Sequence, residues 1–388
     1  MTPRPKPWIA GLEPYVPGKP IEELERELGI ANAVKLASNE NPLGPSPRAV
    51  EAIRSKAAEV HRYPDGASHR LREALATRLG VARESLVFGC GADEILELVA
   101  KCFLGPGDEC VFAWPSFAMY PIVVKGMGAT PVAVPLDAAF VHDLDAMAAA
   151  VTKRTRVVIV CNPNNPTGTV VGAAAFDRFA AALPSDVVLL IDEAYVDFSR
   201  PPDRIDGLAW AARRPGTLSA RTFSKIAGLA GMRVGYAVAD RELAGFLERA
   251  RHPFNLNVLA EVAALAALDD REHLERTLRT NRQGLEYLTR ELAALGIESW
   301  PSAANFVLAK PGPDAYERLL RKGVIVRPLA GFGLPEHVRI TVGTAEENER
   351  LVKALVEIRK RGTEGTSRPS ARAQRAAGAR SRKPEATR

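Results

Sequence analysis

The 388-residue sequence contains no uninterrupted apolar segment of the about 20 residues that a membrane-spanning helix needs. Its start, MTPRPKPWIAGLEPYVPGKP, is broken repeatedly by proline and glycine, so it lacks the continuous apolar core of a secretory signal. We therefore expect a cytoplasmic protein that does not associate with a membrane.

Cysteine is scarce as well. The four cysteines, Cys90, Cys102, Cys110 and Cys161, include no CxxC pair, and no histidine cluster accompanies them. This spacing argues against a zinc site and against a disulfide framework. We expect reduced, mostly buried thiols and no metal site.

The sequence also lacks repeats of about 20 to 50 residues, which argues against solenoids and propellers. Most of the net charge of +6 comes from residues 363–388, which hold seven basic and two acidic side chains. This tail has few large apolar residues, so it cannot bury enough surface to fold alone. We expect it to be solvated and disordered, and we expect no nucleic-acid partner.

Short apolar runs alternate with longer helical patterns between residues 86 and 240. The runs LVFGC, RVVIVC and DVVLLI are rich in β-branched residues, and the last two are apolar almost throughout. Such alternation is typical of a mostly parallel sheet that is covered by helices on both faces. We predict an α/β fold in which ligands bind at the carboxyl ends of these strands.

The pattern changes after residue 240. It is helical to about residue 297, and VIVR and EHVRITV then indicate a second, smaller sheet. A length of 388 residues, at about 150 residues per domain, also suggests two or three folding units. We predict an N-terminal arm (1–35), a large ligand-binding domain (36–270), a smaller α+β C-terminal domain (271–362) and the basic tail (363–388).

Four short segments carry groups suited to binding or catalysis. The first, GCGADE at residues 89–94, lies between a strand and a helix, where free backbone amides can bind phosphate. Because Glu94 stands where a GxGxxG dinucleotide fingerprint has its third glycine, a nicotinamide-dependent oxidoreductase is a weakened alternative.

The other three segments follow along the chain. NPNNPTG, at residues 162–168, is a rigid turn that displays amide side chains. DEAY places Asp192 at the end of a central strand, where a half-buried carboxylate usually needs a cationic partner. RTFSK ends at Lys225 and is followed by Arg233, which together give hydroxyls, an amine and a guanidinium. Each segment alone has an ordinary structural explanation, but their joint order is far more specific.

Together with SNENPLGPSP, RYPDG and VRITVGT, these segments make the chain resemble the fold type I pyridoxal-phosphate aminotransferases from Tyr15 to Arg361. The likeness is greatest to the histidinol-phosphate aminotransferase family. It implies a large domain with a mostly parallel sheet, a smaller α+β domain and pyridoxal 5'-phosphate as the cofactor.

The resemblance also assigns the catalytic roles. Lys225 would bond covalently to the cofactor aldehyde and, after the substrate amine displaces it, would carry a proton between substrate and cofactor. Asp192 would pair with the protonated ring nitrogen. Tyr195 and Asn165 would hydrogen-bond the phenolic oxygen of the ring. Phe117 would stack on the ring face, where tyrosine is common in relatives.

Six residues are implied as ligands of the cofactor phosphate: the backbone amides of Ala92 and Asp93, the hydroxyls of Thr222 and Ser224, the guanidinium of Arg233, and Tyr63 of the partner subunit. An arginine fork matches phosphate oxygens well, whereas the carboxylate of Asp93 would repel them. Since Tyr63 would come from a second copy, we expect a homodimer with shared active sites.

At the substrate end, the resemblance implies that Arg339 holds the α-carboxylate or, for an amino alcohol phosphate, takes part in holding the phosphate. Arg327 would assist it, and Asn39 and Tyr15 would line the same end. The loop at residues 331–333 (GFG) has glycines that could absorb closure over the pocket.

The expected activity is transamination between L-histidinol phosphate and 2-oxoglutarate, in histidine biosynthesis. An aromatic-amino-acid aminotransferase is the first alternative, and a phosphothreonine decarboxylase is a second, because relatives do this chemistry on the same cofactor framework. A regulatory module built from an aminotransferase body is a further alternative, although no additional DNA-binding segment precedes the motifs.

Overall fold

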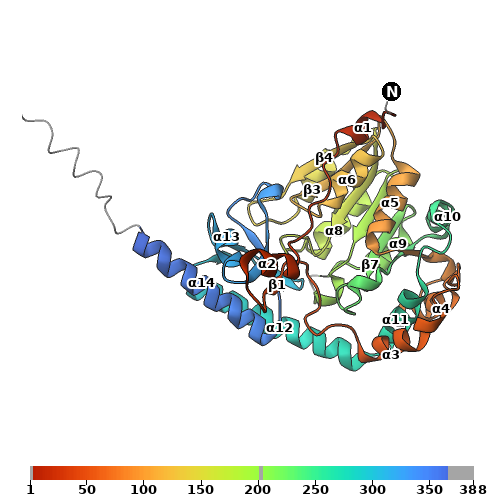
Figure 1. Cartoon of the computed structure of the whole chain (residues 1–388). Helices are drawn as coiled ribbons and strands as arrows, with labels where there is room; N and C mark the ends of the chain where they lie inside the picture. Colours follow the sequence, from red (N-terminus) through yellow and green to blue (C-terminus); the bar gives the residue numbers. More distant parts are fainter. Residues whose placement is uncertain (1–2, 201–203, 366–388) are drawn as a thin grey trace, which may run out of the picture.

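The computed structural model describes residues 3–200 and 204–365, with side chains to residue 359. The chain forms two sheets (Figure 1). The larger has seven strands in the order β2 (Leu86–Gly89), β8 (Gly235–Ala239), β7 (Thr217–Thr222), β6 (Val188–Asp192), β5 (Thr155–Cys161), β3 (Glu109–Trp114) and β4 (Thr130–Pro135). Only β8 runs antiparallel to its neighbours. The predicted α/β fold with a mostly parallel sheet is confirmed.

Helices cover both faces of this sheet, as the apolar central strands require. One face packs against α5 (Ala92–Phe103), α6 (Met119–Gly126) and α10 (Arg241–Ala250); the other packs against α7 (Leu144–Ala149), α8 (Ala173–Ala182) and α9 (Gly207–Arg213). Side chains alternate along β5, where Val157 and Ile159 face one helical layer and Val158 and Val160 face the other.

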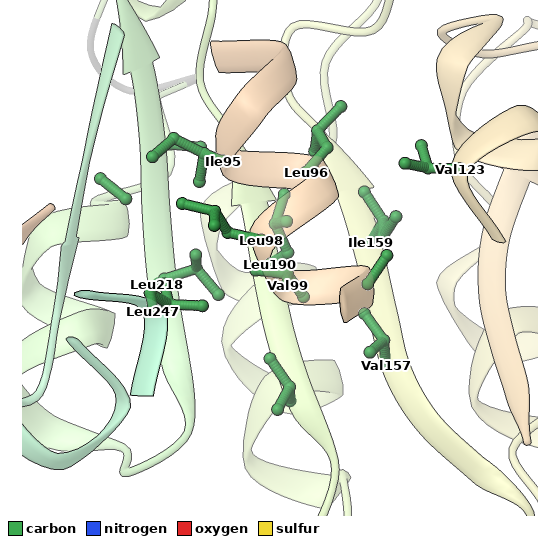
Figure 2. Packing of buried hydrophobic residues seen from close by; sticks show 14 of the residues in the cluster. Ile95, Leu96, Leu98, Val99, Val123, Val157, Ile159, Leu190, Leu218 and Leu247 are labelled. Carbon is green, nitrogen blue, oxygen red and sulfur yellow. The ribbon is translucent and has the colours of Figure 1, made fainter. Parts of the chain in front are cut away.

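Figure 2 shows the first of these layers, in which α5 lies across the central strands. Ile95 and Val99 of α5 are buried among Ile159, Leu190 and Leu218 of three neighbouring strands. Burying each such side chain contributes about 1.5–3 kcal/mol to folding. This packing fixes the start of α5 beside the carboxyl ends of β6 and β7.

A third helical layer flanks the β2 end of the sheet and consists of α3 (Pro47–Lys56), α4 (His69–Leu79) and α11 (Val258–Leu268). The α12 helix (Arg271–Ala294) then leads away from it along the lower edge of Figure 1. The side chain of Asp270 caps its first turn by accepting from the backbone N–H of His273 at 3.1 Å. At about 1.5 Å per residue, this helix is long enough to join the two sheets.

The smaller sheet contains five strands in the order β1 (Val34–Leu36), β11 (Val324–Pro328), β12 (Val338–Thr341), β10 (Phe306–Lys310) and β9 (Glu298–Ser299). The far half of α12, α13 (Ala315–Leu320) and α14 (Ala345–Gly365) pack against it. The sheet indicated by VIVR and EHVRITV is therefore present. A strand from the N-terminal region, β1, joins it in parallel with β11, which the sequence pattern did not reveal.

The N-terminal region, with α1 (Pro7–Ala10) and α2 (Ile21–Leu28), runs from the large sheet to the small one. Trp8 donates a hydrogen bond to the carbonyl of Gly126 at 3.1 Å, and Leu24 is buried beside Ile325. The segment between these anchors, which includes Tyr15 and Val16, therefore crosses the space between the two sheets.

Within the described residues, no helix is long and apolar enough to cross a membrane. The four cysteines are free, and two of them, Cys110 and Cys161, are buried. Cys90 is exposed and Cys102 is partly exposed, so fewer thiols are buried than the sequence suggested. The predicted basic tail lies outside the described residues, apart from its first three positions at the end of α14.

Candidate active site

A cavity of about 190 Å³ opens where β5, β6 and β7 end, between the large sheet and the smaller one. All but one of the residues predicted to bind or catalyse line it: Tyr15, Asn39, Ala92, Asp93, Phe117, Asn165, Asp192, Tyr195, Thr222, Ser224, Lys225, Arg233, Arg327 and Arg339. Residues separated by more than 300 positions therefore meet in one site. The exception is Tyr63.

Lys225 follows β7 in the turn that continues from Thr222. Its Nζ donates to the carbonyl oxygen of Ser38 at 3.3 Å and lies 5.8 Å from the centre of the Tyr195 ring. Burial, and next the positive charge of Arg339, lower the pKa of Lys225 to about 8. The neutral form of this amine, which a nucleophile requires, is therefore more populated near physiological pH than that of an ordinary lysine.

This lowered pKa predicts a pH-dependent effect on stability. The pKa of Lys225 is about 8 in the folded protein against an ordinary value of 10.5, so the unfolded chain binds more protons between these pH values. The cost of burying the amine is complete below pH 8 and disappears as the pH rises towards 10.5. We expect Lys225→Met to stabilise the cofactor-free protein at pH 7 and to lose this advantage by pH 10, as measured by urea unfolding.

Lys153, which is exposed, provides the control for this measurement. Lys153→Met should change the free energy of unfolding equally at both pH values. If the difference between Lys225→Met and wild type were the same at pH 7 and pH 10, the fold would not lower the pKa of the Lys225 amine.

Asp192 is the last residue of β6, and its side chain is buried, with the residue 5% exposed. Its Oδ2 accepts from the hydroxyl of Tyr120 at 2.6 Å, and its Oδ1 accepts from the backbone N–H of Ala194 at 3.1 Å. Burial raises the pKa of this carboxyl. Among the described residues no cation lies within salt-bridge distance of it, so the site suits a ligand that brings a positive charge.

Tyr195 belongs to a buried network that crosses between the two sheets. Its hydroxyl accepts from Asn39 Nδ2 at 2.8 Å, and Asn39 Oδ1 accepts from the hydroxyl of Thr341 at 2.9 Å. Asn305 Nδ2 donates to the backbone carbonyl of Asn39 at 3.0 Å. Asn39, which was expected at the substrate end, therefore also orients Tyr195.

Another part of the cavity wall, here called the anion end, has the groups of an anion site. Ala92 and Asp93 begin the 12-residue helix α5, whose first N–H groups have no partner within the helix. Arg233 reaches this end and forms an ion pair with Asp93 at 3.0 Å. This pairing offsets the negative charge of Asp93 beside a bound anion.

The backbone beside this end requires glycine at two positions. A Cβ on Gly91, whose φ is +78°, would lie 2.4 Å from Nη2 of Arg233. A Cβ on Gly235 would lie 2.4 Å from the backbone nitrogen of Ala92, which would displace the start of α5. Thr222 donates to the hydroxyl of Ser224 at 2.9 Å, so both hydroxyls also lie together here.

The two predicted arginines of the substrate end differ in their surroundings. Arg339 is buried; it donates from Nη1 to Asn165 Oδ1 and from Nη2 to the carbonyl of Ala37, both at 2.6 Å. Its Nε is buried and has no hydrogen-bond partner among the described residues, and burial lowers the pKa of Arg339 to about 10. Arg327 donates to the carbonyl of Val16 at 2.9 Å and lies 5.6 Å from the centre of the Tyr15 ring. Arg327 thus holds the N-terminal segment against the pocket.

Tyr63 lies outside the cavity and is 84% exposed. Its ring stacks on that of Phe254, with centroids 4.8 Å apart. Phe254 is also exposed, so two aromatic rings stand together on the surface. At this position the Tyr63 side chain does not reach the cavity of its own chain, but it is free to contact a second copy of the chain.

Sequence reasoning missed Tyr120, Ser38 and Ala194. Tyr120 lies three residues after Phe117 in WPSFAMY, and the two rings meet edge to face at 5.7 Å. Nothing in the sequence distinguishes this tyrosine from a core aromatic residue, since its contact with Asp192 joins positions 72 residues apart. Ser38 acts through its backbone carbonyl, which no side-chain pattern reveals. Ala194 lies between Asp192 and Tyr195 in the DEAY motif, and this position is the one sequence signal that could have indicated its part in the site.

Residues 31–355 match the family described as aminotransferase class I and II. The chain is 48% identical over 350 residues to histidinol-phosphate aminotransferase 1 of Nitrosococcus oceani, covering 89% of this chain and 94% of the relative. It is 49% identical over 358 residues to histidinol-phosphate aminotransferase 2 of Pseudomonas aeruginosa, covering 91% and 97%.

Solved structures give a consistent result. The structure of histidinol-phosphate aminotransferase from Sinorhizobium meliloti in complex with pyridoxal-5'-phosphate matches with a TM-score of 0.85 and 31% identity, covering 92% of this chain and 98% of that one. Aspartate aminotransferase from Thermus thermophilus with maleate matches with a TM-score of 0.79 and 26% identity, covering 92% and 99%.

Proposed function

The chain belongs to the class I and II aminotransferase family, and from this premise we propose that it transfers the amino group of L-histidinol phosphate to 2-oxoglutarate. The products would be imidazole acetol phosphate and glutamate, in histidine biosynthesis. The relatives that support this donor are 46–49% identical to the chain over about nine tenths of its length. The resemblance inferred from the order of the motifs is confirmed.

The donor set of the cavity fits pyridoxal 5'-phosphate as the cofactor. An anion end formed by the start of α5 and Arg233 suits its phosphate, and the buried carboxylate of Asp192 suits its ring nitrogen in the protonated form. Lys225, with its lowered pKa, supplies the amine for the aldehyde. When bound, the cofactor supplies an electron sink for the bond changes at the substrate α-carbon.

The remaining chemistry belongs to the side chains of the chain. Lys225 lines the cavity beside the Tyr195 ring, where its amine can hold and return the proton of the substrate α-carbon. Asn165 accepts a hydrogen bond from Arg339, and Tyr195 lines the same cavity; both would hold the phenolic oxygen of the cofactor ring. The buried guanidinium of Arg339, which lines the cavity, would hold the anionic end of the donor.

One observation carries this proposal: the amine of Lys225 and the carboxylate of Asp192 line the same cavity, together with an anion end. The test is a donor panel with 2-oxoglutarate as acceptor, with kcat/KM measured for L-histidinol phosphate, phenylalanine and tyrosine. We expect kcat/KM for L-histidinol phosphate to be the highest of the three, because the curated relatives at 46–49% identity are histidinol-phosphate aminotransferases.

The same panel separates the alternatives. Faster turnover of phenylalanine or tyrosine would replace the proposed donor but leave the reaction class intact. Release of carbon dioxide from phosphothreonine without consumption of a 2-oxo acid would indicate a decarboxylase. A protein that binds no pyridoxal phosphate and turns over no donor would contradict the proposed reaction itself.

The exposed Tyr63 supports a homodimer in which each chain completes the phosphate site of the other. Mixing two inactive variants tests this. If Tyr63 acts across the interface, Lys225→Ala mixed with Tyr63→Ala should regain up to about a quarter of wild-type turnover, because a mixed dimer contains one site with both native residues. Recovery should require subunit exchange, so turnover should return when the two variants are refolded together and not when folded dimers are mixed without exchange. Absence of recovery in a mixture shown to contain mixed dimers would contradict a shared site.

We also place the protein in the cytoplasm. The four cysteines are free in the structure, and free thiols are usual in reducing compartments.

A further inference from the structure

The Asp192 carboxylate has one side-chain partner among the described residues, and it is a group that the proposed function does not use. The hydroxyl of Tyr120 donates to Asp192 Oδ2 at 2.6 Å. Tyr120 lies in the first turn of α6, in the helical layer that also contains α5, and is 0% exposed. The Tyr120 hydroxyl is therefore shielded from water, while Asp192 also lines the cavity.

The packing around Tyr120 holds its hydroxyl in one place. Its ring lies 5.8 Å from that of Phe112 and 5.7 Å from that of Phe117, which lines the cavity. The thiol of Cys161, at the end of the adjacent strand β5, also lies within hydrogen-bonding reach of the hydroxyl. A tyrosine enclosed in this way cannot turn away from Asp192 without disturbing both aromatic contacts.

The electrostatic surroundings make this hydrogen bond important. Burial raises the pKa of Asp192, and the nearby acids Asp93 and Glu193 raise it further. Two donors oppose this by stabilising the charged form: Tyr120 and the backbone N–H of Ala194. Burial also raises the pKa of Tyr120 well above its usual value, so Tyr120 keeps its proton and remains a donor.

On the premise of the proposed cofactor, we propose that Tyr120 is a positioning residue that keeps Asp192 ionised and aimed at the ring nitrogen of pyridoxal phosphate. One oxygen of the carboxylate is held by the Tyr120 hydroxyl, and the other accepts from the backbone. The carboxylate is thus fixed before the cofactor binds. Tyr120 acts through Asp192 and has no role of its own in proton transfer.

The test is Tyr120→Phe, which removes the hydroxyl and keeps the ring. We expect the dissociation constant of pyridoxal phosphate, measured by fluorescence titration of the cofactor-free protein, to rise about tenfold to a hundredfold, the usual effect of losing a hydrogen bond to a charged group. We also expect the acid limit of cofactor binding to move to higher pH, because the pKa of Asp192 would rise without this donor.

A double-mutant cycle with Asp192→Asn distinguishes positioning from a merely structural role. If Tyr120 acts through the carboxylate, Tyr120→Phe should change cofactor affinity by less than about twofold in the Asp192→Asn background. Equal losses in both backgrounds would show that Tyr120 only supports the fold and would overturn the proposal.

Tyr236 offers a matched control, since it is a buried tyrosine on β8 whose hydroxyl faces Arg221 and not Asp192. Tyr236→Phe should leave the acid limit of cofactor binding unchanged. If wild type bound no pyridoxal phosphate, the proposed function would fail. If wild type bound it and Tyr120→Phe bound it equally well over the same pH range, only the role of Tyr120 would fail.

Discussion

Lys225→Ala is expected to abolish transamination, with kcat reduced by at least about a thousandfold. The variant loses the amine that bonds to the cofactor and also the base beside the substrate α-carbon, and no other lysine lines the cavity within the described residues. Borohydride treatment followed by mass spectrometry should find the cofactor attached to wild type and absent from the variant.

The exposed Lys153 again provides the control, because Lys153→Ala removes an amine far from the motifs that line the cavity. That variant should keep both turnover and covalent attachment. Wild-type turnover by Lys225→Ala, or attachment to a different lysine, would show that the assignment of Lys225 is wrong.

Asp192→Asn is expected to lower kcat by roughly two to three orders of magnitude while some cofactor remains bound. The amide keeps nearly the shape of the carboxylate, but it has no charge with which to stabilise a protonated ring nitrogen. The anion end, formed by α5 and Arg233, is untouched and should still retain the phosphate. Turnover and cofactor content are therefore measured on the same preparation.

Asp186 is the matched control, because it lies just before the opposite end of the same strand and its side chain is 72% exposed. Asp186→Asn removes the same charge from the chain without approaching the cavity and should leave kcat unchanged. If Asp192→Asn turned over at the wild-type rate with full cofactor content, Asp192 would not pair with the ring nitrogen.

The two predictions rest on short-range signals that the sequence contains in full. β6 is apolar throughout and ends at Asp192, so the carboxylate is placed at the carboxyl edge of a central strand by local pattern alone. The start of α5 follows the same logic, because parallel strands bring their carboxyl ends to one edge of the sheet. The sequence pattern did not predict β7, so the place of Lys225 in the site followed only from the resemblance. The positions of Asp192 and of the start of α5 were therefore predictable from motifs next to strands.

The contacts between these motifs were not predictable in the same way. Arg339, on β12 of the smaller sheet, was expected to hold substrate. The structure adds that it donates to Asn165, which follows β5 of the larger sheet. Arg327 is engaged by the N-terminal segment through the carbonyl of Val16. Such contacts depend on how the smaller sheet docks against the larger one, which no local pattern describes.

By itself, the sequence determined the strands that lead to Asn162 and Asp192, the helix that follows GCGADE and the identity of the reactive groups, because hydrophobic period and turn chemistry act over a few residues. Only the tertiary structure decided that β1 joins the smaller sheet, that Asn39 reaches Tyr195 and that Tyr120 donates to Asp192. These pairings join positions up to about 290 residues apart. They form because burying apolar faces brings distant segments together, after which their polar groups must find partners out of water.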